Sequence, residues 1–524
     1  MSQAAYIQDM LADPTVPDQA TGPREVANFY ANRNVLLTGG SGFLGRLLTE
    51  RILRSCPNIN QLFLLLRAKK GKTPHERFKE LFDDVIFDRL KRERPNFGRK
   101  VSLIEGDMMQ VGLGLSVEHR EQLRATHVVL HGAATVRFDE KLRTAVNINV
   151  RGTKELLSLA KEMTNLKAFV HVSTAYANCP RSDIDEKFYP PPMNSEKLLG
   201  LLDILDDASL DHLTPVLLGE WPNTYTFTKA VAEDTVRQYR QNLPLCILRP
   251  SIVIATAKEP VSGWINNVYG PTGMVVGAAV GLLRTLRCDP DMVADLIPAD
   301  YVVNAIIVAA WDIAKTQSLN LNSLDGPDIE EPPIYNVVSS CQRPWTWGQF
   351  TEYTERYAMA IPSPMCLWYY CFLLHKRAWM HKICVVFLHL VPAAIVDSIL
   401  WLSGRKPMLW EAYRKIHKFS GVISYFTLQQ WRFHNNATLK LAERMTPADR
   451  NEFDLDIGSL NWEDYTHHHV RGLRVYLFKD PLDTVPQGRA KYRRLKIAHY
   501  TVVWTFGLLC LWLLWALLRT IGLV

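Results

Sequence analysis

The sequence predicts an α/β fold in which a doubly wound parallel sheet is followed by a mostly helical region and a C-terminal transmembrane helix. Three observations support this prediction. Apolar runs alternate with helix-period segments from Asn34 to about Ala314, a glycine-rich turn follows the first run, and Ala498–Leu518 contains no charged side chain. Alternating strands and helices are typical of parallel sheets with helices on both faces.

The predicted strands are short and continuously apolar, as is typical of parallel strands that are covered on both faces. The first, Val35–Thr38, precedes a helix through about Leu53, and a further strand is expected near Ile334–Ser339. The others are expected at Leu62–Leu66, Val101–Glu105, Val128–His131, Phe169–Ser173 and Leu245–Arg249. A nucleotide would bind at the carboxyl ends of these strands.

A glycine-rich turn directly follows the first predicted strand. Gly39 allows a tight turn, Gly42 lets a pyrophosphate approach the backbone, and Gly45 lets the helix pack close to the strand. The helix then begins with bare N–H groups, which bind anions. The spacing Gly-x-x-Gly-x-x-Gly resembles the fingerprint of extended short-chain dehydrogenases, and a ligand-free turn is the alternative. The expected dinucleotide contacts are Thr38, Gly39, Gly42, Phe43, Leu44 and Gly45.

Basic side chains follow the second predicted strand, where an NAD-specific enzyme usually carries an acidic residue. Arg67 and Lys69, with Lys70 beside them, fit the 2′-phosphate of NADP, and a solvated basic turn is the alternative. Asp107 follows the third strand and is expected to reach the adenine. Further cofactor contacts are expected after the fourth and sixth strands, at Ala133, Thr135, Pro250 and Ile252.

Tyr225 and Lys229 are four residues apart and would share one helix face. A lysine ammonium beside the phenol is expected to lower its pKa and make Tyr225 a usable acid. Lys229 would also hold the nicotinamide ribose. At the end of the fifth strand, one hydroxyl would donate to a substrate carbonyl oxygen alongside Tyr225. The residues alone leave the choice of hydroxyl open, but the resemblance to extended short-chain dehydrogenases favours Thr174, with Ser173 as the fallback. A purely structural cap of the strand end is the alternative.

Composition excludes several classes of function. The net charge of +7 is spread along the chain and not gathered on one face, so no nucleic-acid partner is expected. The nine cysteines form no Cys-x-x-Cys pair and indicate reduced thiols in a cytosol-facing protein. The run His467–His469 has no nearby cysteine or spaced acidic partner, so no metal site is expected.

Ala498–Leu518 is long enough to cross a bilayer as a helix. Basic residues from Lys491 to Lys496 precede it and place the catalytic region in the cytosol, so a tail anchor is expected, with a buried core helix as the alternative. The apolar run Ile383–Leu402 contains His389, Pro392 and Asp397. It fits either a buried or membrane-associated hairpin lining an acyl tunnel, or an ordinary helical core pair.

Four segments are expected along the chain. Residues 1–32 form a polar tail without a signal peptide, 33–345 a nucleotide-binding domain, 346–490 a helical domain, and 491–524 a juxtamembrane segment with the anchor. Within the second, Ser182–Pro222 is expected to be an insertion over the active site. It would carry a helix near Ser195–Leu205, capped by Ser195.

Together these residues resemble the alcohol-forming fatty acyl-CoA reductases, which join a Rossmann-like extended short-chain dehydrogenase domain to a C-terminal "sterile" domain. The likeness covers most of the chain. In the front part it lies in Thr38–Gly45, Leu65–Lys69, Gly106-Asp107, Ala133–Phe138, Val172–Asn178, Tyr225–Lys229 and Arg249–Val253. In the back part it lies in Tyr425-Phe426, Trp431–Phe433, Asn436, Asp456–Tyr465 and Gly472–Leu477.

The resemblance implies NADPH-dependent reduction of a long-chain fatty acyl-CoA to a primary alcohol, a precursor of waxes, ether lipids or cuticular lipids. Hydride would attack the thioester carbonyl, Thr174 and Tyr225 would stabilise the oxyanion, and CoA would leave an aldehyde. A second NADPH would reduce the aldehyde, with Tyr225 donating the proton. The membrane would be that of the endoplasmic reticulum or the peroxisome, and acyl chain length and a homo-oligomer are left open.

Two other functions are weighed. A membrane-bound short-chain dehydrogenase acting on a sterol or another hydrophobic ketone or aldehyde would share Tyr225 and Lys229 but release no CoA. The aromatic spacings after residue 420 argue against it. A cofactor-sensing scaffold without chemistry is the other, and an intact set of Thr174, Tyr225 and Lys229 argues against that.

Overall fold

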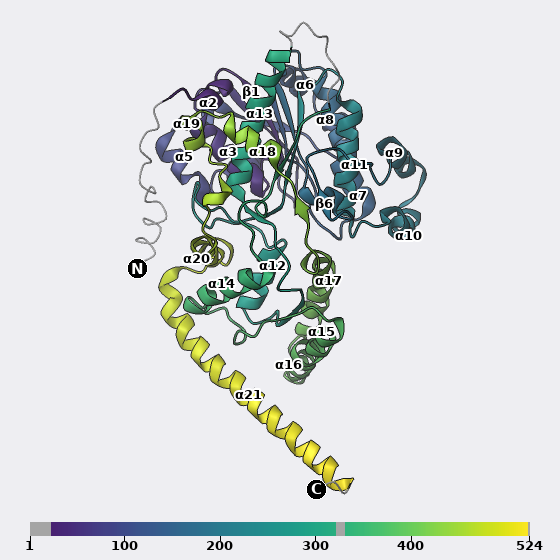
Figure 1. Ribbon diagram of the computed structural model, residues 1–524, viewed down its shortest axis with the longest axis vertical. Helices are drawn as coiled ribbons and strands as arrows, with labels where there is room; N and C mark the ends of the chain where they lie inside the picture. The colour runs from purple at the N-terminus through teal and green to yellow at the C-terminus, as the bar shows by residue number, and fades with distance from the viewer. Residues whose placement is uncertain (1–21, 321–330, 522–524) are drawn as a thin grey trace.

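The computed structural model describes residues 22–320 and 331–521, and at its core is a seven-stranded parallel sheet (Figure 1). The strand order is β11-β7-β5-β4-β1-β2-β3, so β1 and β4 are neighbours and the order reverses between them. Ligands of doubly wound sheets bind at this reversal. The strands are β1 (Asn34–Thr38), β2 (Gln61–Leu66), β3 (Val101–Glu105), β4 (Val128–His131), β5 (Ala168–Val172), β7 (Leu245–Pro250) and β11 (Ile334–Val337).

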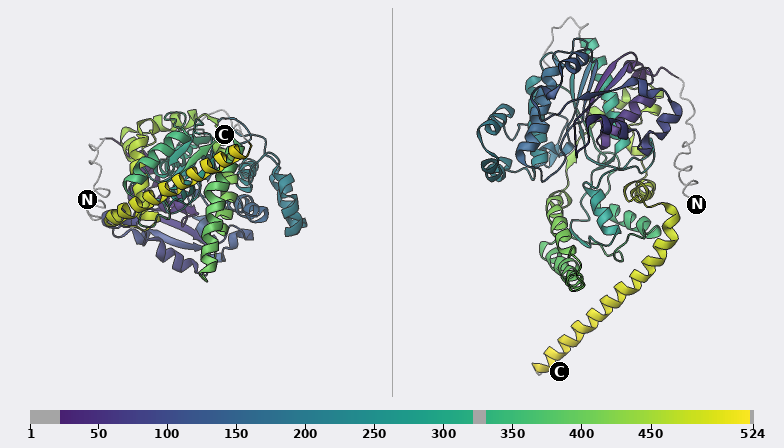
Figure 2. Two further views of the ribbon diagram at one scale, coloured as in Figure 1. Left: turned by 90° about the horizontal axis from the view of Figure 1, so that it is seen from below. Right: turned by 180° about the vertical axis from the view of Figure 1, so that it is seen from behind.

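Helices cover both faces of the sheet (Figures 1 and 2). Because neighbouring side chains of a strand point to opposite faces, Leu37 and Leu36 of β1 belong to different cores. On one face pack α3 (Phe43–Ser55) and α13 (Ala299–Asn320), and on the other α8 (Gly152–Ala160) and α11 (Thr224–Tyr239). The doubly wound α/β fold expected from the sequence is confirmed.

The segment Ser182–Pro222 holds two helices, α9 (Ser195–Ile204) and α10 (Asp207–Leu218). The expected cap is wrong by one residue, because the side chain of Asn194 accepts hydrogen bonds from the N–H groups of Glu196 and Lys197, both at 3.1 Å. Sequence analysis missed α10, which contains Pro215, a residue that argues against a helix interior.

The region after β11 is mainly helical and is tied to the sheet region by two short parallel pairings. β13 (Arg432–Phe433) pairs with β6 (Asp183–Ile184), and β12 (Leu373–His375) pairs with β9 (Thr285–Arg287). Its helices include α14 (Trp347–Ala360), α15 (Ala378–Val385), α16 (Val391–Leu402), α17 (Leu409–Thr427), α18 (Asn436–Glu443), α19 (Pro447–Glu452) and α20 (Trp462–Gly472).

The two ends of the described chain differ in character. Residues 1–21 of the expected polar tail lie outside the described residues, but α2 (Glu25–Tyr30) is docked on α19, where the Asp449 carboxylate accepts a hydrogen bond from Glu25 N at 2.8 Å. At the other end, α21 (Val485–Thr520) extends away from the rest of the molecule (Figure 1) and includes Ala498–Leu518. Residues 522–524 lie outside the described part.

Candidate active site

The glycine-rich turn joins β1 to α3 and leaves the first turn of α3 without a side-chain cap. Gly39 has a φ of +79°, and a Cβ there would lie 2.8 Å from the backbone nitrogen of Ala133. A Cβ on Gly45 would collide with the carbonyl of Gly39. Glycine is therefore required at both positions, and the uncapped N–H groups of Phe43 and Leu44 at the helix start suit a diphosphate.

The glycine-rich turn lies against the carboxyl end of β4. The Thr38 hydroxyl lies 2.7 Å from Nδ1 of His131 and accepts a hydrogen bond from Ala133 N at 3.2 Å. Burial lowers the pKa of His131 to about 3, with a further contribution from Lys229, so its imidazole is neutral. Thr38 and Ala133, both expected cofactor contacts, therefore meet at one point between β1 and β4.

Asn149 links the loop after β4 to α11, and sequence analysis did not identify it. Its Oδ1 accepts a hydrogen bond from Thr135 N at 3.0 Å, and its Nδ2 donates to the Thr228 hydroxyl at 2.9 Å. Asn149 lies in the π-helical turn η4 (Asn147–Arg151). Such turns interrupt α-helices frequently at functional sites, which is a structural signal with no counterpart in the sequence pattern.

The basic residues after β2 face the same turn. Arg67 pairs with Asp107 at 3.2 Å, so these two expected cofactor contacts are partners of each other. A further cation, Arg77 of α4 (Pro74–Leu81), donates to the Ser41 hydroxyl at 2.6 Å and to the carbonyl of Arg67. Burial, with help from the charges of Arg77 and Arg67, lowers the pKa of Lys69. The sequence did not reveal Arg77.

Tyr225 and Thr174 form the centre of the site. Tyr225 lies in the first turn of α11, which Asn223 caps by accepting a hydrogen bond from Thr226 N at 2.9 Å. Thr174 lies two residues beyond the end of β5, and its hydroxyl lies close enough to the Tyr225 phenol to lower the pKa of that phenol. It also lies 3.5 Å from the carbonyl oxygen of Pro250, an expected cofactor contact. Ile252 follows in β8 (Ile252–Ile254), which pairs with β10 (Leu296–Pro298).

The expected lowering of the Tyr225 pKa is wrong for this structure. Burial raises the pKa of Tyr225 to about 12, and the nearby Thr174 hydroxyl offsets this only in part. Lys229 is fully enclosed, and its ammonium donates to the carbonyl of Val172 at 2.7 Å. Burial lowers the pKa of Lys229 to about 8, against the attraction of Glu233. The i, i+4 spacing does not reveal this, because burial is decided by packing.

Ser173 has a different environment from its neighbour. Its hydroxyl donates to Oε1 of Glu233 at 2.6 Å. Arg249 donates hydrogen bonds to both oxygens of the same carboxylate, at 2.9 and 2.7 Å, and both charged side chains are buried. Arg249 also donates to the carbonyls of Asp185 and Lys187 at 3.0 Å. Ser173 is therefore engaged in a buried ion pair, and Thr174 is the hydroxyl that meets Tyr225.

The C-terminal helical region contributes aromatic side chains beside the site. Phe426 of α17 stacks on Phe138 with ring centroids 5.6 Å apart, and Phe138 lies 5.9 Å from the ring of Tyr225. Tyr176, just after Thr174, makes edge contacts with the rings of Phe426, Trp431 and Phe433. The two parts of the chain thus meet at an apolar wall next to the reacting hydroxyls.

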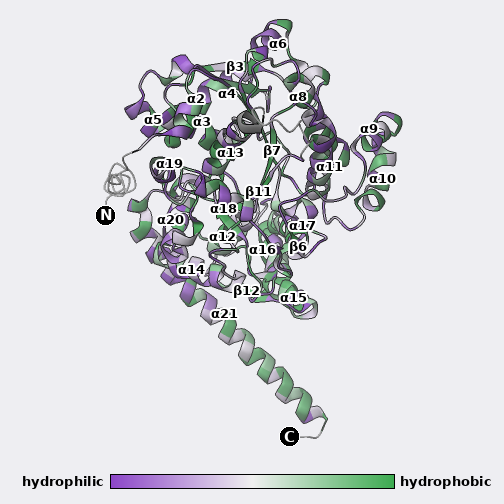
Figure 3. Cartoon of the chain, turned by 45° about the horizontal axis from the view of Figure 1, so that its top comes forward, coloured by the Kyte–Doolittle hydropathy of each residue, from purple (hydrophilic) through white to green (hydrophobic). Residues whose placement is uncertain are grey.

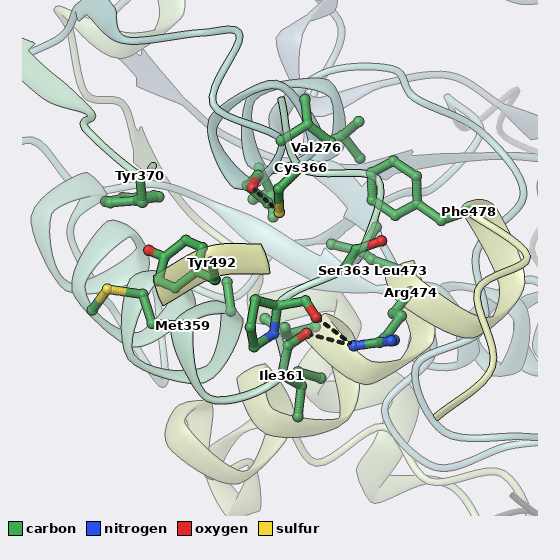
Figure 4. A pocket seen from close by; sticks show the side chains of 16 residues that line it. Val276, Met359, Ile361, Ser363, Cys366, Tyr370, Leu473, Arg474, Phe478 and Tyr492 are labelled. Carbon is green, nitrogen blue, oxygen red and sulfur yellow. Dashed lines mark hydrogen bonds between the residues drawn. The ribbon is translucent and has the colours of Figure 1, made fainter. Parts of the chain in front are cut away.

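A separate pocket lies between α12 (Pro271–Ala279), α14 and the start of α21 (Figure 4). Its lining is mostly apolar, and Arg474 donates to the carbonyls of Ile361 and Pro362 at 2.8 and 3.0 Å. Its volume of about 40 Å³ has room for a water molecule or two but not for a long acyl chain. This pocket is therefore no substrate site.

The histidine run on α20 has an acidic neighbour after all. Asp464, His467 and His468 offer ligand atoms that lie within 4.8 Å of one another. The expectation that no acidic partner stands near this run is wrong, because Asp464 lies one helical turn before it. The trio belongs to α20 and not to the elements around Tyr225.

Sequence comparisons match both parts of the chain. Two family models described as male sterility protein match it: an NAD-binding model over residues 37–306 and a "sterile" model over residues 388–480. The chain is 42% identical to "Fatty acyl-CoA reductase wat" of Drosophila melanogaster, over 94% of this chain and 93% of that protein. It is 36% identical to "Fatty acyl-CoA reductase 1" of Homo sapiens, over 91% and 90%.

Solved structures with the same fold include reductase domains of biosynthetic assembly lines. The reductase domain of a non-ribosomal peptide synthetase from Mycobacterium tuberculosis matches with a TM-score of 0.53 at 18% identity, covering 90% of this chain and 97% of that one. The terminal reductase domain of the myxalamid pathway matches with a TM-score of 0.52 at 19% identity, covering 86% and 92%. At these identities the likeness shows the fold.

Proposed function

Since the chain belongs to the fatty acyl-CoA reductase family and is thereby an oxidoreductase acting on fatty acyl-CoA, we propose that it uses NADPH to reduce a long-chain acyl-CoA to the primary alcohol. The reaction releases CoA and passes through the aldehyde. The observation that supports this most is that the hydroxyls of Thr174 and Tyr225 lie close together in a chain whose glycine-rich turn suits a dinucleotide.

The nicotinamide cofactor supplies a hydride to the carbonyl carbon when it is bound. The chain's own hydroxyls act on the carbonyl oxygen. Thr174 and Tyr225 donate hydrogen bonds to the negative charge that develops there, and such donors contribute most where water is excluded. The tetrahedral adduct of the thioester then collapses, and the C–S bond breaks with release of CoA thiol.

The aldehyde meets the same two hydroxyls. In this second step Tyr225 transfers its phenolic proton to the developing alkoxide, and the alcohol leaves. The Tyr225 pKa of about 12 keeps the phenol protonated at neutral pH, as a proton donor requires. Lys229, held by the carbonyl of Val172, would hold the ribose of the cofactor. Ser173 instead supports the buried pair of Glu233 and Arg249 and takes no part in the reaction.

Selectivity for NADPH comes from the cations beside the glycine-rich turn. Arg67, Lys69 and Arg77 surround the place where a 2′-phosphate would lie. The acidic residue closest to them, Asp107, is already paired with Arg67. A cluster of cations without an open carboxylate favours a phosphate over a ribose hydroxyl. Thr38, Gly39, Gly42, Gly45 and Ala133 would hold the diphosphate and the adjoining ribose.

We assign α21 as a membrane anchor. Its apolar part is long enough to cross a bilayer, and its side chains are not buried in the protein. Figure 3 shows the hydrophobic colour over this part of α21 and hydrophilic colour where it begins. The basic residues from Lys491 to Lys496 then lie in the cytosol together with the catalytic site. The membrane is that of the endoplasmic reticulum or the peroxisome. We divide the chain after residue 32, where the polar tail ends, after residue 345, where the nucleotide-binding domain ends, and after residue 490, where the helical domain ends.

Purified full-length protein with palmitoyl-CoA and NADPH tests this function. We expect oxidation of NADPH that depends on the thioester, with two NADPH consumed for each hexadecanol and each free CoA formed. A chain that oxidises NADPH with a sterol ketone but not with the acyl-CoA would favour the dehydrogenase alternative. Absence of thioester-dependent oxidation would overturn the proposal.

A further inference from the structure

A long apolar stripe runs along the outside of the continuous helix formed by α15, the π-helical turn η6 (Val386–Leu390) and α16. Its members recur about once per turn, so they share one face. Their exposed fractions in the folded chain run from 42% for Val391 to 77% for Leu402. The stripe comprises Trp379, Ile383, Phe387, Val391, Ile395, Ile399 and Leu402. Figure 3 shows the hydrophobic colour on these helices.

The opposite face of the same helix is held by polar contacts to the protein. His389, at mid-length, accepts a hydrogen bond from the backbone N–H of Arg284 at 2.9 Å, and Arg284 donates to the carbonyl of Leu388 at 3.1 Å. Asp397 accepts hydrogen bonds from the N–H groups of Met408, Leu409 and Trp410 at the start of α17. A helix fastened at mid-length to Arg284, directly before β9, does not cross a bilayer, because that segment would have to enter the hydrocarbon core.

The direction of the helix fits the same conclusion. Figure 1 shows α16 nearly end-on at the lower side of the molecule, and the view from below in Figure 2 shows the helix lengthwise. It therefore lies across the face from which α21 extends. The two elements meet where Phe387 and Phe506 lie with ring centroids 5.9 Å apart. Phe506 belongs to the apolar part of α21, so the stripe lies, at Phe387, at the same depth as the anchor's own apolar segment.

We infer that the α15–α16 helix lies in the plane of the membrane, with its apolar stripe immersed in the same leaflet that α21 enters. The partner is a phospholipid bilayer. Both ends of the stripe carry exposed cations, Arg377 and Lys382 at one end and Arg405 and Lys406 at the other, as is typical of helices at a headgroup boundary. This inference rests on the proposed anchoring by α21 and adds a second, non-spanning contact.

The inferred contact places the membrane surface at one end of α17. This helix starts where Asp397 caps it, next to α16, and its other end carries Phe426 beside Phe138 and Tyr225. Nineteen residues of helix span about 28 Å. The flat helix thereby fixes the distance and direction between the leaflet that contains acyl substrate and the hydroxyls that act on it.

Nitroxide depth measurements on the full chain in liposomes test this inference. The exposed cysteines Cys341 and Cys510 are first replaced by serine, and that chain without added cysteine gives the labelling background. Single labels are then placed by Ile395→Cys on the stripe, Leu511→Cys on α21 and Leu213→Cys on α10, which is exposed in the sheet region. The liposomes contain phosphatidylcholine with a minority of phosphatidylserine, and the collision rates with oxygen and with a water-soluble nickel chelate give the depth.

We expect the Ile395→Cys label at a shallow depth of roughly 5–10 Å, the Leu511→Cys label deeper, and the Leu213→Cys label in water. An Ile395→Cys label in water with a deep Leu511→Cys label would overturn the flat helix while leaving the anchor intact. An Ile395→Cys label at the bilayer centre would show a spanning helix instead. If the Ile395→Cys and Leu511→Cys labels are both in water, α21 is not a membrane anchor either. Ile399→Cys provides a second reporter, and NADPH oxidation with palmitoyl-CoA verifies that each labelled chain is folded.

Discussion

Phe426 of the C-terminal helical region stacks on Phe138 of the sheet region, with ring centroids 5.6 Å apart and an interplanar angle of 24°. Phe138 in turn lies 5.9 Å from the Tyr225 ring. A side chain on α17 therefore supports the surroundings of the reacting phenol from the other part of the chain. The helical region thus forms part of the wall around the proposed active site.

Phe426→Ala should raise the KM for palmitoyl-CoA, because Phe138 loses the ring that holds it beside the acyl chain. It should also lower the free energy of unfolding by about 3–5 kcal/mol, as large-to-small changes of buried aromatics do. Phe350→Ala is the matched control, because Phe350 is also buried but packs on Trp345. The control should lose stability with an unchanged KM. Equal KM values in the two variants would contradict a role for Phe426 at the site.

Thr174→Ala and Ser173→Ala should separate chemistry from stability. Thr174→Ala removes the hydroxyl that meets Tyr225, and kcat should fall by about 10²–10³-fold, as for loss of one oxyanion donor. Thr174→Ser keeps the hydroxyl and should recover most of the rate. Ser173→Ala takes one donor from the buried Glu233, so thermal unfolding should shift downward while kcat changes little. A larger loss of kcat in Ser173→Ala would make Ser173 the reacting hydroxyl.

The pH dependence should follow Lys229. Its pKa of about 8 means that kcat/KM should fall as the pH rises through 8, because the ammonium is lost while Tyr225 stays protonated. Stability should change in the opposite direction. Between pH 8 and the ordinary pKa of 10.5, the unfolded chain holds a proton that the folded chain has released, so the free energy of unfolding rises with pH.

Lys229→Met should abolish both the fall of kcat/KM above pH 8 and the rise of the free energy of unfolding with pH. Chemical denaturation across this pH window, in parallel with initial rates, measures them on the same preparation. If the residual activity of Lys229→Met still shows the wild-type fall of kcat/KM above pH 8, that fall belongs to the titration of another group.

Arg77→Ala should weaken binding of NADPH by about ten-fold or more and leave NADH binding nearly unchanged, since one charge-assisted contact to the 2′-phosphate is lost. Lys79→Ala on the same helix is the control, because that side chain is exposed and faces away from the turn. Cofactor titration followed by tryptophan fluorescence measures both affinities. An equal loss for NADPH and NADH would place Arg77 on the diphosphate instead.

The strands and the glycine-rich turn were predictable from the sequence because their signals are local. Continuous apolar runs such as Val128–Leu130 are typical of strands that are covered on both faces, and the glycine spacing reflects contacts within one turn. Arg77 escaped notice because a reversal at Gly71, with a φ of +77°, returns its helix to Ser41. Phe426 and the burial that sets the Tyr225 pKa depend on packing between distant segments, which spacing along the chain does not encode.

The central claim is that Thr174 and Tyr225 serve both carbonyl reductions, and Tyr225→Phe tests it most directly. Rates are measured with palmitoyl-CoA and with hexadecanal, and Tyr239→Phe at the far end of the same helix is the control. We predict that Tyr225→Phe loses both activities by about 10²–10⁴-fold while still binding NADPH, and that the control keeps both. A Tyr225→Phe chain that still reduces hexadecanal at the wild-type rate would contradict a single site for the two steps.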